Sequence, residues 1–279
     1  MKKINFCFLN GKIIKENEAK FGIFDIGIQR GYGIFEVLRT YNKTPFLLEE
    51  HIQRLFTSAK KINLKIPYSK NKISQEIHKL LKINKENKDS LIKIIVTGGE
   101  SQDGLSPGKK PTFLLTTRKL KEPNKNLYTQ GVRVLTLKYQ RDLPSVKTLN
   151  YIELVKSWKT LKKKKAFTLL YIKNKKVLEG ATSNIFLFRK NKLLTPKSGI
   201  LRGITRNLVL RLAKKNFSVE EKDIKLNELI TADEVFLTGT TIGILPVVKI
   251  DNKTIAEGKP GKNTLKLIKI FNQYTKSLQ

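Results

Sequence analysis

The chain has 279 residues, 39% of them hydrophobic, which is enough for one large domain or two of moderate size. Its single cysteine, Cys7, excludes an intramolecular disulfide and any multi-cysteine metal site, and we expect it to be a buried strand residue. No apolar run reaches the roughly 18 residues that predict a membrane span, so we expect a cytoplasmic protein.

The formal net charge is +33, from 56 Lys and Arg against 23 Asp and Glu. Such an excess is typical of proteins that bind nucleic acid or an anionic surface. Here it is mostly lysine, is spread along the chain and accompanies many Ile and Asn residues, as codon bias alone would produce. The one dense block, 162–165, is interpreted as the basic end of a helix. We therefore do not expect a nucleic-acid partner, although a basic nucleic-acid-binding protein that has lost catalysis is an alternative.

The first half of the chain predicts short strands followed by helices. Strands are expected at 4–9, 12–15 and 33–41, with a hairpin turn at Asn10-Gly11 between the first two. In the third strand, two sets of side chains alternate between opposite faces: Phe35, Val37 and Arg39 against Ile34, Glu36 and Leu38. Apolar residues at helical spacing predict helices over 48–62 and from Ser69 through Leu81. Further strands are expected at 92–97 and 112–117.

The polar residues 119–131 are predicted to be a linker between an N-terminal α/β domain, 1–118, and a C-terminal domain, 132–279. The second half predicts strands and helices in mixed order: a strand at 132–137, a helix at 150–164, strands at 167–172, 177–179, 185–189 and 193–194, a helix at 206–215 and a strand at 234–238. The fold class is therefore mixed α/β with two lobes, and most of the candidate chemistry falls in the second.

Lys147 stands out from the many other lysines because of its setting. It lies at the end of an extended segment, Leu143-Pro-Ser-Val-Lys147, just before the helix predicted at 150–164. A lysine in that position can be partly desolvated, which favours the neutral, nucleophilic amine. Such an amine can hold a carbonyl cofactor as a Schiff base.

Other residues supply the groups that a charged, phosphorylated aromatic cofactor needs. Glu179 ends a strand and can accept a hydrogen bond from a protonated ring nitrogen. Arg54 shares a helix face with His51 and suits a bidentate phosphate contact. The turns at Gly203-Ile204-Thr205 and Gly239-Thr240-Thr241 can offer backbone N–H groups and hydroxyls to an anion.

Four segments together resemble the class IV, fold-type IV pyridoxal-phosphate enzymes. That family includes branched-chain aminotransferases, D-amino-acid aminotransferases and 4-amino-4-deoxychorismate lyases. The most specific segment begins at Glu179-Gly-Ala-Thr-Ser-Asn184-Ile-Phe, continues through Leu193-Leu-Thr195 and ends at 200–206. The other three, 35–41, 50–55 and 146–150, match in the same order. The resemblance covers nearly the whole chain, from about residue 25 to 251.

The resemblance implies a small N-terminal α/β domain and a larger, β-barrel-like C-terminal domain with helices. It implies pyridoxal 5′-phosphate (PLP) as the cofactor, and no metal. Lys147 matches the lysine that holds PLP and moves the proton, and Glu179 matches the partner of the pyridine nitrogen. The phosphate contacts match Arg54, Ile204, Thr205 and Thr240. A homodimer is implied, because the family's active site borrows a loop from a second subunit.

D-amino-acid aminotransferases resemble one another in an Arg-x-His motif that binds the substrate carboxylate. This chain has Asp103 and Leu105 at the matching positions, so the motif is absent, and it has Phe35 where those enzymes carry Tyr. The similarity therefore favours transfer of an amino group from a branched-chain or other hydrophobic amino acid to a 2-keto acid such as 2-oxoglutarate. D-amino-acid aminotransferase and aminodeoxychorismate lyase are the alternatives. The candidate substrate-binding residues are Phe35, Arg39, Thr240 and Thr241, with Arg30 as another possible carboxylate anchor.

Overall fold

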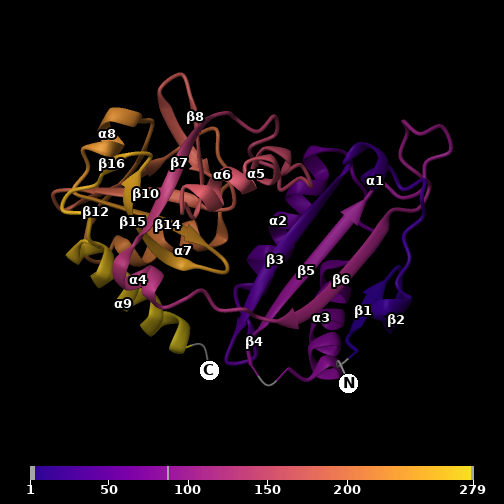
Figure 1. The fold of residues 1–279 in the computed structure, drawn as a ribbon. Helices are drawn as coiled ribbons and strands as arrows, with labels where there is room; N and C mark the ends of the chain where they lie inside the picture. Colours follow the sequence, from indigo (N-terminus) through magenta and orange to yellow (C-terminus); the bar gives the residue numbers. More distant parts are fainter. Residues whose placement is uncertain (1–3, 87, 278–279) are drawn as a thin grey trace. The chain divides into compact units, whose positions relative to one another are not determined.

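The computed structural model describes residues 4–86 and 88–277, which form two compact units (Figure 1). The first unit comprises residues up to 121 together with the short segment 146–150. The second comprises residues 122–145 and 151–277. Lys147 therefore belongs to the first unit, although the sequence on both sides of its segment belongs to the second.

The first unit contains an antiparallel sheet in the order β2-β1-β6-β5-β3-β4. Its strands are β1 (Phe6–Leu9), β2 (Lys12–Lys15), β3 (Gly33–Tyr41), β4 (Thr44–Pro45), β5 (Ser90–Thr97) and β6 (Thr112–Lys119). The predicted bounds of β2 and β3 are confirmed. The predicted turn between β1 and β2 is also confirmed, since Asn10 and Gly11 have φ of 48° and 96°.

Two helices of the first unit, α2 (Leu48–Lys61) and α3 (Lys70–Asn84), pack against strands of this sheet, whose members β3, β5 and β6 lie side by side in Figure 1. Ile52 and Leu55 of α2 are fully buried in the core that the helices share with the sheet. The predicted start of α3 is confirmed, because the Ser69 hydroxyl accepts a hydrogen bond from the Lys72 N–H. A 3-10 helix, η1 (Glu16–Glu18), and the short helix α1 (Ile26–Arg30) precede β3.

The second unit is built on a ten-stranded sheet in the order β12-β11-β10-β14-β15-β7-β8-β9-β13, with β16 paired to β15. The strands are β7 (Val132–Lys138), β8 (Thr168–Lys173), β9 (Lys176–Gly180), β10 (Asn184–Arg189), β11 (Lys192–Pro196), β12 (Ser218–Lys222), β13 (Ile224–Lys225), β14 (Glu234–Gly239), β15 (Gly243–Ile250) and β16 (Lys253–Thr254). The sheet curves until β9 also contacts β10 and β11, which makes it a nearly closed barrel. The predicted fold class is confirmed.

Six helices accompany this barrel in the described part of the chain: α4 (Asn126–Gln130), α5 (Ile152–Lys156), α6 (Trp158–Lys163), α7 (Ile204–Ala213), α8 (Leu226–Ile230) and α9 (Lys262–Lys276). The single helix predicted over 150–164 is wrong, because Ser157 separates α5 from α6. Three apolar residues of these two helices, Ile152, Val155 and Trp158, are 67%, 71% and 56% exposed. They therefore do not pack into the core of the barrel.

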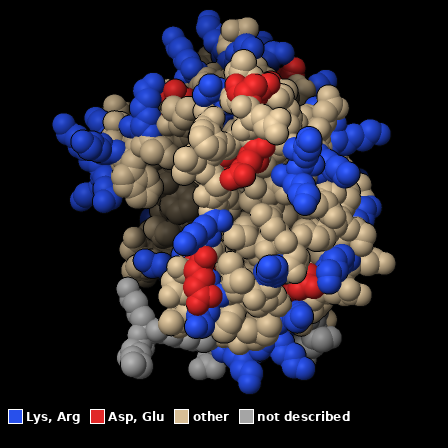
Figure 2. Space-filling model, turned by 90° about the vertical axis from the view of Figure 1, so that its right-hand side faces the viewer, with Lys and Arg blue, Asp and Glu red and all other residues tan. Residues whose placement is uncertain are grey.

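Lys and Arg side chains are scattered over the face of the molecule drawn in Figure 2, with Asp and Glu between them. This distribution fits charge that is spread along the chain. None of the helices in the part of the chain that the structure describes has the length and apolar character needed to cross a lipid bilayer.

Candidate active site

Lys147 is held in the first unit by its own backbone. The Phe35 N–H donates to the Lys147 carbonyl at 3.0 Å, and Ile34 and Thr148 form an antiparallel bridge. Val146 is 1% exposed and packs in the core under α2 and β3. The segment thus adds a short strand pairing to the start of β3. The Lys147 Nζ lies 4.4 Å from the centre of the Phe35 ring.

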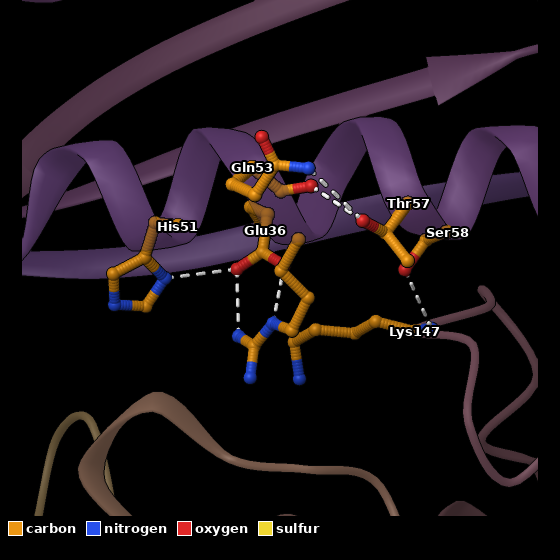
Figure 3. A network of polar contacts seen from close by, with 7 residues as sticks. Glu36, His51, Gln53, Thr57, Ser58 and Lys147 are labelled. Carbon is orange, nitrogen blue, oxygen red and sulfur yellow. Dashed lines mark hydrogen bonds and ion pairs between the residues drawn. The ribbon is translucent and has the colours of Figure 1, made fainter. Parts of the chain in front are cut away.

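A buried ionic network occupies the same part of the first unit (Figure 3). Glu36 on β3 has no exposed surface, and its two oxygens accept hydrogen bonds of 2.7 Å from Nε and Nη2 of Arg54 on α2. The His51 Nδ1 lies 2.9 Å from Glu36 Oε2. Because a carboxylate only accepts hydrogen bonds, this contact indicates that Nδ1 carries the proton.

The pKa values of this network follow from burial and charge. Burial alone would raise the pKa of Glu36, but the charge and hydrogen bonds of Arg54, together with His51, lower it to about 2. Burial lowers the pKa of His51; the Glu36 carboxylate opposes this effect, while the positive charges of Arg54 and Lys147 add to it. Arg54 and Lys147 therefore both act on the same buried histidine. The side chain of Lys147 extends toward this network in Figure 3.

The sequence identified Arg54, His51 and Phe35 but missed the role of Glu36. A usable signal was present, because the alternation along β3 places Glu36 on the same face as Ile34 and Leu38. A carboxylate on a core-facing position needs a cationic partner, and the arginine predicted on α2 supplies it.

Arg39 and Arg30 lie in other surroundings. The Arg39 guanidinium is centred 4.0 Å from the Tyr41 ring, and its Nη2 lies 3.6 Å from Asp89 Oδ2. Arg39 is 5% exposed and lies four residues beyond Phe35 on β3, which corresponds to about 13 Å along a strand. Arg30 ends the short helix α1 and is exposed.

In the second unit, Glu179 is a buried carboxylate near the end of β9. Its Oε1 accepts from Arg141 Nη2 at 2.5 Å and from Arg141 Nε at 3.0 Å. Its Oε2 accepts from the backbone N–H of Leu201 at 2.9 Å. The last contact ties Glu179 to the loop that leads into α7. No local pattern in the sequence indicated that Arg141 is the partner.

Helix α7 begins after this loop, with Gly203 at its N-cap and Ile204 and Thr205 in its first turn. Gly203 has no side chain that could accept from the first turn, and the first N–H groups of a helix have no intrahelical partner, so they can bind an anion. A Cβ at Gly203 would overlap with Asn184 Oδ1. Asn184 in turn donates to the Leu201 carbonyl at 2.7 Å, so the approach to the helix is tightly fixed.

Thr240 and Thr241 occupy the hairpin turn between β14 and β15, also in the second unit. The Ile242 N–H closes this turn by donating to the Gly239 carbonyl at 3.2 Å. Gly243 follows with φ of 58°, a conformation that favours glycine. Both threonines are partly exposed, so the turn can present their hydroxyl groups to a small molecule.

The comparisons with known proteins agree on one family. A profile described as amino-transferase class IV matches residues 33–250. A Methanocaldococcus jannaschii protein, provisionally named a branched-chain-amino-acid aminotransferase, is 36% identical, with 95% of this chain and 94% of that protein covered. The D-alanine aminotransferase of Bacillus licheniformis is 34% identical, with coverage of 91% and 92%.

Solved structures share the fold. The branched-chain aminotransferase of the archaeon Thermoproteus uzoniensis with norvaline is 26% identical and superposes with a TM-score of 0.89, covering 98% of this chain and 95% of that one. The branched-chain amino acid aminotransferase of Escherichia coli is 24% identical and gives 0.90, with coverage of 97% and 94%. The chain belongs to the class IV aminotransferases, which are PLP-dependent transaminases acting on small amino and keto acids.

The donor groups of this chain fit PLP. The buried Glu179 can accept from a cationic ring nitrogen, and the first N–H groups of α7, after Gly203, can receive a phosphate. Lys147 offers a primary amine in the first unit. Its charge and that of Arg54 both act on His51. When bound, PLP withdraws electrons from the substrate Cα, so that the proton on this carbon can leave.

Proposed function

We propose that the enzyme transfers an amino group from a branched-chain or other hydrophobic amino acid to a 2-keto acid such as 2-oxoglutarate. Lys147 is the residue that binds PLP covalently and moves the proton at the substrate Cα. The observation that carries this assignment is the pairing of the Lys147 segment with the start of β3, which holds the Lys147 amine beside the Phe35 ring. The anchored backbone limits the positions that this amine can reach.

The remaining residues bind different parts of PLP. Glu179 keeps the ring nitrogen protonated by accepting its hydrogen bond. Ile204, Thr205 and Thr240 offer N–H and hydroxyl groups to the phosphate, as the open start of α7 supports. Arg54 adds a guanidinium whose orientation is fixed by its two hydrogen bonds to Glu36.

The loop that carries Asp103 and Leu105 supports a hydrophobic substrate. Backbone N–H groups of Ser106 and Leu105 lower the pKa of Asp103, so this residue is an anion at neutral pH. An anion repels a substrate carboxylate, whereas the trap of D-amino-acid aminotransferases is cationic. Leu105 is 74% exposed and can offer apolar contact, as can Phe35.

D-amino-acid transfer is the second candidate function. It is favoured by the D-alanine aminotransferases of Bacillus licheniformis and Listeria monocytogenes, each 34% identical to this chain. One screen separates the candidates: L-leucine, L-isoleucine, L-valine, D-alanine and D-glutamate as donors, each with 2-oxoglutarate or pyruvate. We expect the L-branched donors with 2-oxoglutarate to react fastest. Faster reaction of D-alanine contradicts the assignment, and release of pyruvate from aminodeoxychorismate without an acceptor indicates the lyase instead.

We also propose that the enzyme is a cytoplasmic homodimer. Ile152, Val155 and Trp158 leave a run of apolar surface on α5 and α6 of the second unit. Large apolar side chains exposed on a protein surface can mark protein–protein interfaces. On the first unit, Ile23, Phe24 and Ile28 are likewise 75%, 57% and 62% exposed.

A further inference from the structure

Arg141 forms a buried ion pair with Glu179 inside the second unit. The two side chains are 9% and 6% exposed, and both guanidinium donors Nε and Nη2 reach the same carboxylate oxygen, Oε1. Arg141 Nη2 also donates to the Pro144 carbonyl at 2.6 Å. The guanidinium is thus fixed by both the carboxylate and the backbone, at a distance of 38 residues along the chain from Glu179.

Two tyrosines lie close to this pair, since Arg141 and Glu179 both act on the pKa of Tyr171. Tyr171 and Tyr139 pack edge to face, with ring centres 5.0 Å apart. Burial raises the pKa of Tyr171, and the Glu179 charge adds to this, so its phenol is neutral at physiological pH. The N–H of Leu201, which reaches Glu179 Oε2, supplies a dipole rather than a charge.

We infer that Arg141 is a positioning residue that keeps Glu179 ionised and turns its Oε2 side toward the ring nitrogen of PLP. This inference rests on the proposed role of Glu179. The two donors of Arg141 both occupy Oε1, and the Leu201 N–H fixes the direction of Oε2. Arg141 therefore acts on the cofactor through Glu179, without contacting the reacting atoms.

Removing the cation changes the protonation of Glu179. A buried carboxylate that has lost a neighbouring cation takes up a proton at a higher pH, because less now stabilises its charged form against the loss of solvation. A protonated Glu179 is a weaker, uncharged acceptor and no longer stabilises a cationic ring nitrogen by charge. Binding of PLP then falls as the pH is lowered, by up to about tenfold for each pH unit below the raised pKa.

The test is a fluorescence titration of apoenzyme with PLP between pH 5 and 8, with each affinity expressed relative to the unmodified protein at the same pH. The variants are Arg141→Gln, Arg141→Lys, Glu179→Gln and the double variant Arg141→Gln/Glu179→Gln. Arg133→Gln is the matched control, because Arg133 makes three hydrogen bonds in the same unit, to two carbonyls and the Asn252 amide, and none of them is to a carboxylate. Circular dichroism gives the folded fraction of each apoenzyme.

We expect the relative affinity of Arg141→Gln to fall by at least tenfold from pH 8 to pH 5. The relative affinities of Arg141→Lys and Arg133→Gln should not depend on pH in this way. The double variant should bind PLP with the same affinity as Glu179→Gln alone. Suppose that Glu179→Gln weakens PLP binding. The inference is then overturned if the relative PLP affinity of Arg141→Gln does not change with pH, or if Arg133→Gln loses affinity equally. If Glu179→Gln leaves PLP binding unchanged, the proposed role of Glu179 fails, and the inference fails with it.

Discussion

Replacing Glu36 by Gln removes the charge that compensates Arg54 in the core of the first unit. The pKa of Glu36 falls from its ordinary value of 4.5 to about 2, which corresponds to about 3 kcal/mol of stabilisation at ~1.36 kcal/mol per pH unit. Removing one member of a buried ion pair costs about 3–5 kcal/mol in other proteins. We therefore expect Glu36→Gln to lower the free energy of unfolding by about 3–5 kcal/mol at pH 7.

The assay is guanidinium chloride unfolding of the apoenzyme, followed by circular dichroism. Glu49→Gln is the matched control, because Glu49 is exposed in the first turn of the same helix, α2, where a carboxylate contributes at most ~1 kcal/mol through the helix dipole. Both substitutions remove one negative charge and keep the side-chain shape. Their difference therefore isolates the buried network.

The dependence on pH has a defined sign. The pKa of Glu36 is lower in the folded state, so its stabilisation is complete above about pH 4.5 and is lost as the pH falls toward 2. The unmodified protein should lose more stability over this window than Glu36→Gln does. The reasoning is refuted if Glu36→Gln lies within about 1 kcal/mol of Glu49→Gln, a margin typical of exposed ion pairs. Equal pH slopes for the unmodified protein and Glu36→Gln refute it as well.

Three further predictions concern separate parts of the chain. Gly203→Ala should weaken PLP binding by fluorescence titration at least about tenfold, because the added Cβ overlaps with Asn184 and shifts the start of α7; unchanged affinity contradicts a phosphate site there. Val155→Asp should shift the sedimentation coefficient from that of a dimer to that of a monomer. Thr160→Asp, at an exposed polar position of α6, should cause no such shift. If Val155→Asp remains a dimer, this face is not the dimer interface. Cys7 is 1% exposed and burial raises the pKa of its thiol, so a thiol reagent should react only as the protein unfolds, and prompt reaction contradicts the placement of β1.

Local patterns predicted the main strands and the two longer helices of the first unit, but not η1, α1 or β4. Strand β3 was predicted with its correct bounds, and residues 34–38 alternate between a buried face and a more open face. Ser69 marked the start of α3 because its hydroxyl replaces a missing backbone partner. By contrast, the apolar residues at 152–158 indicated one core-facing helix. The structure has two short helices with exposed apolar side chains. The spacing of apolar residues predicts which face of a helix is apolar, but it does not identify the surface that packs against this face.

The candidate site was predictable where one segment carries both the residue and its context. Lys147, Glu179 and the start of α7 all lie in segments with a family signature. The partners of these residues were not predictable, because Arg141 meets Glu179 and Glu36 meets Arg54 only after the chain has folded. Pairing across 38 and 18 residues leaves no trace in local spacing. The pairing of 146–150 with β3 is hidden for the same reason.

The most direct test of the account is to find the lysine that carries PLP. Borohydride reduction of the holoenzyme, followed by proteolysis and mass spectrometry, should place the cofactor on the peptide that contains Lys147. Lys147→Ala should abolish this linkage and turnover, while Lys93→Ala, which removes another amine 5.6 Å from the Phe35 ring, should leave both in place. Reduced cofactor on a different lysine, or transamination that persists in Lys147→Ala at the unmodified rate, contradicts the account.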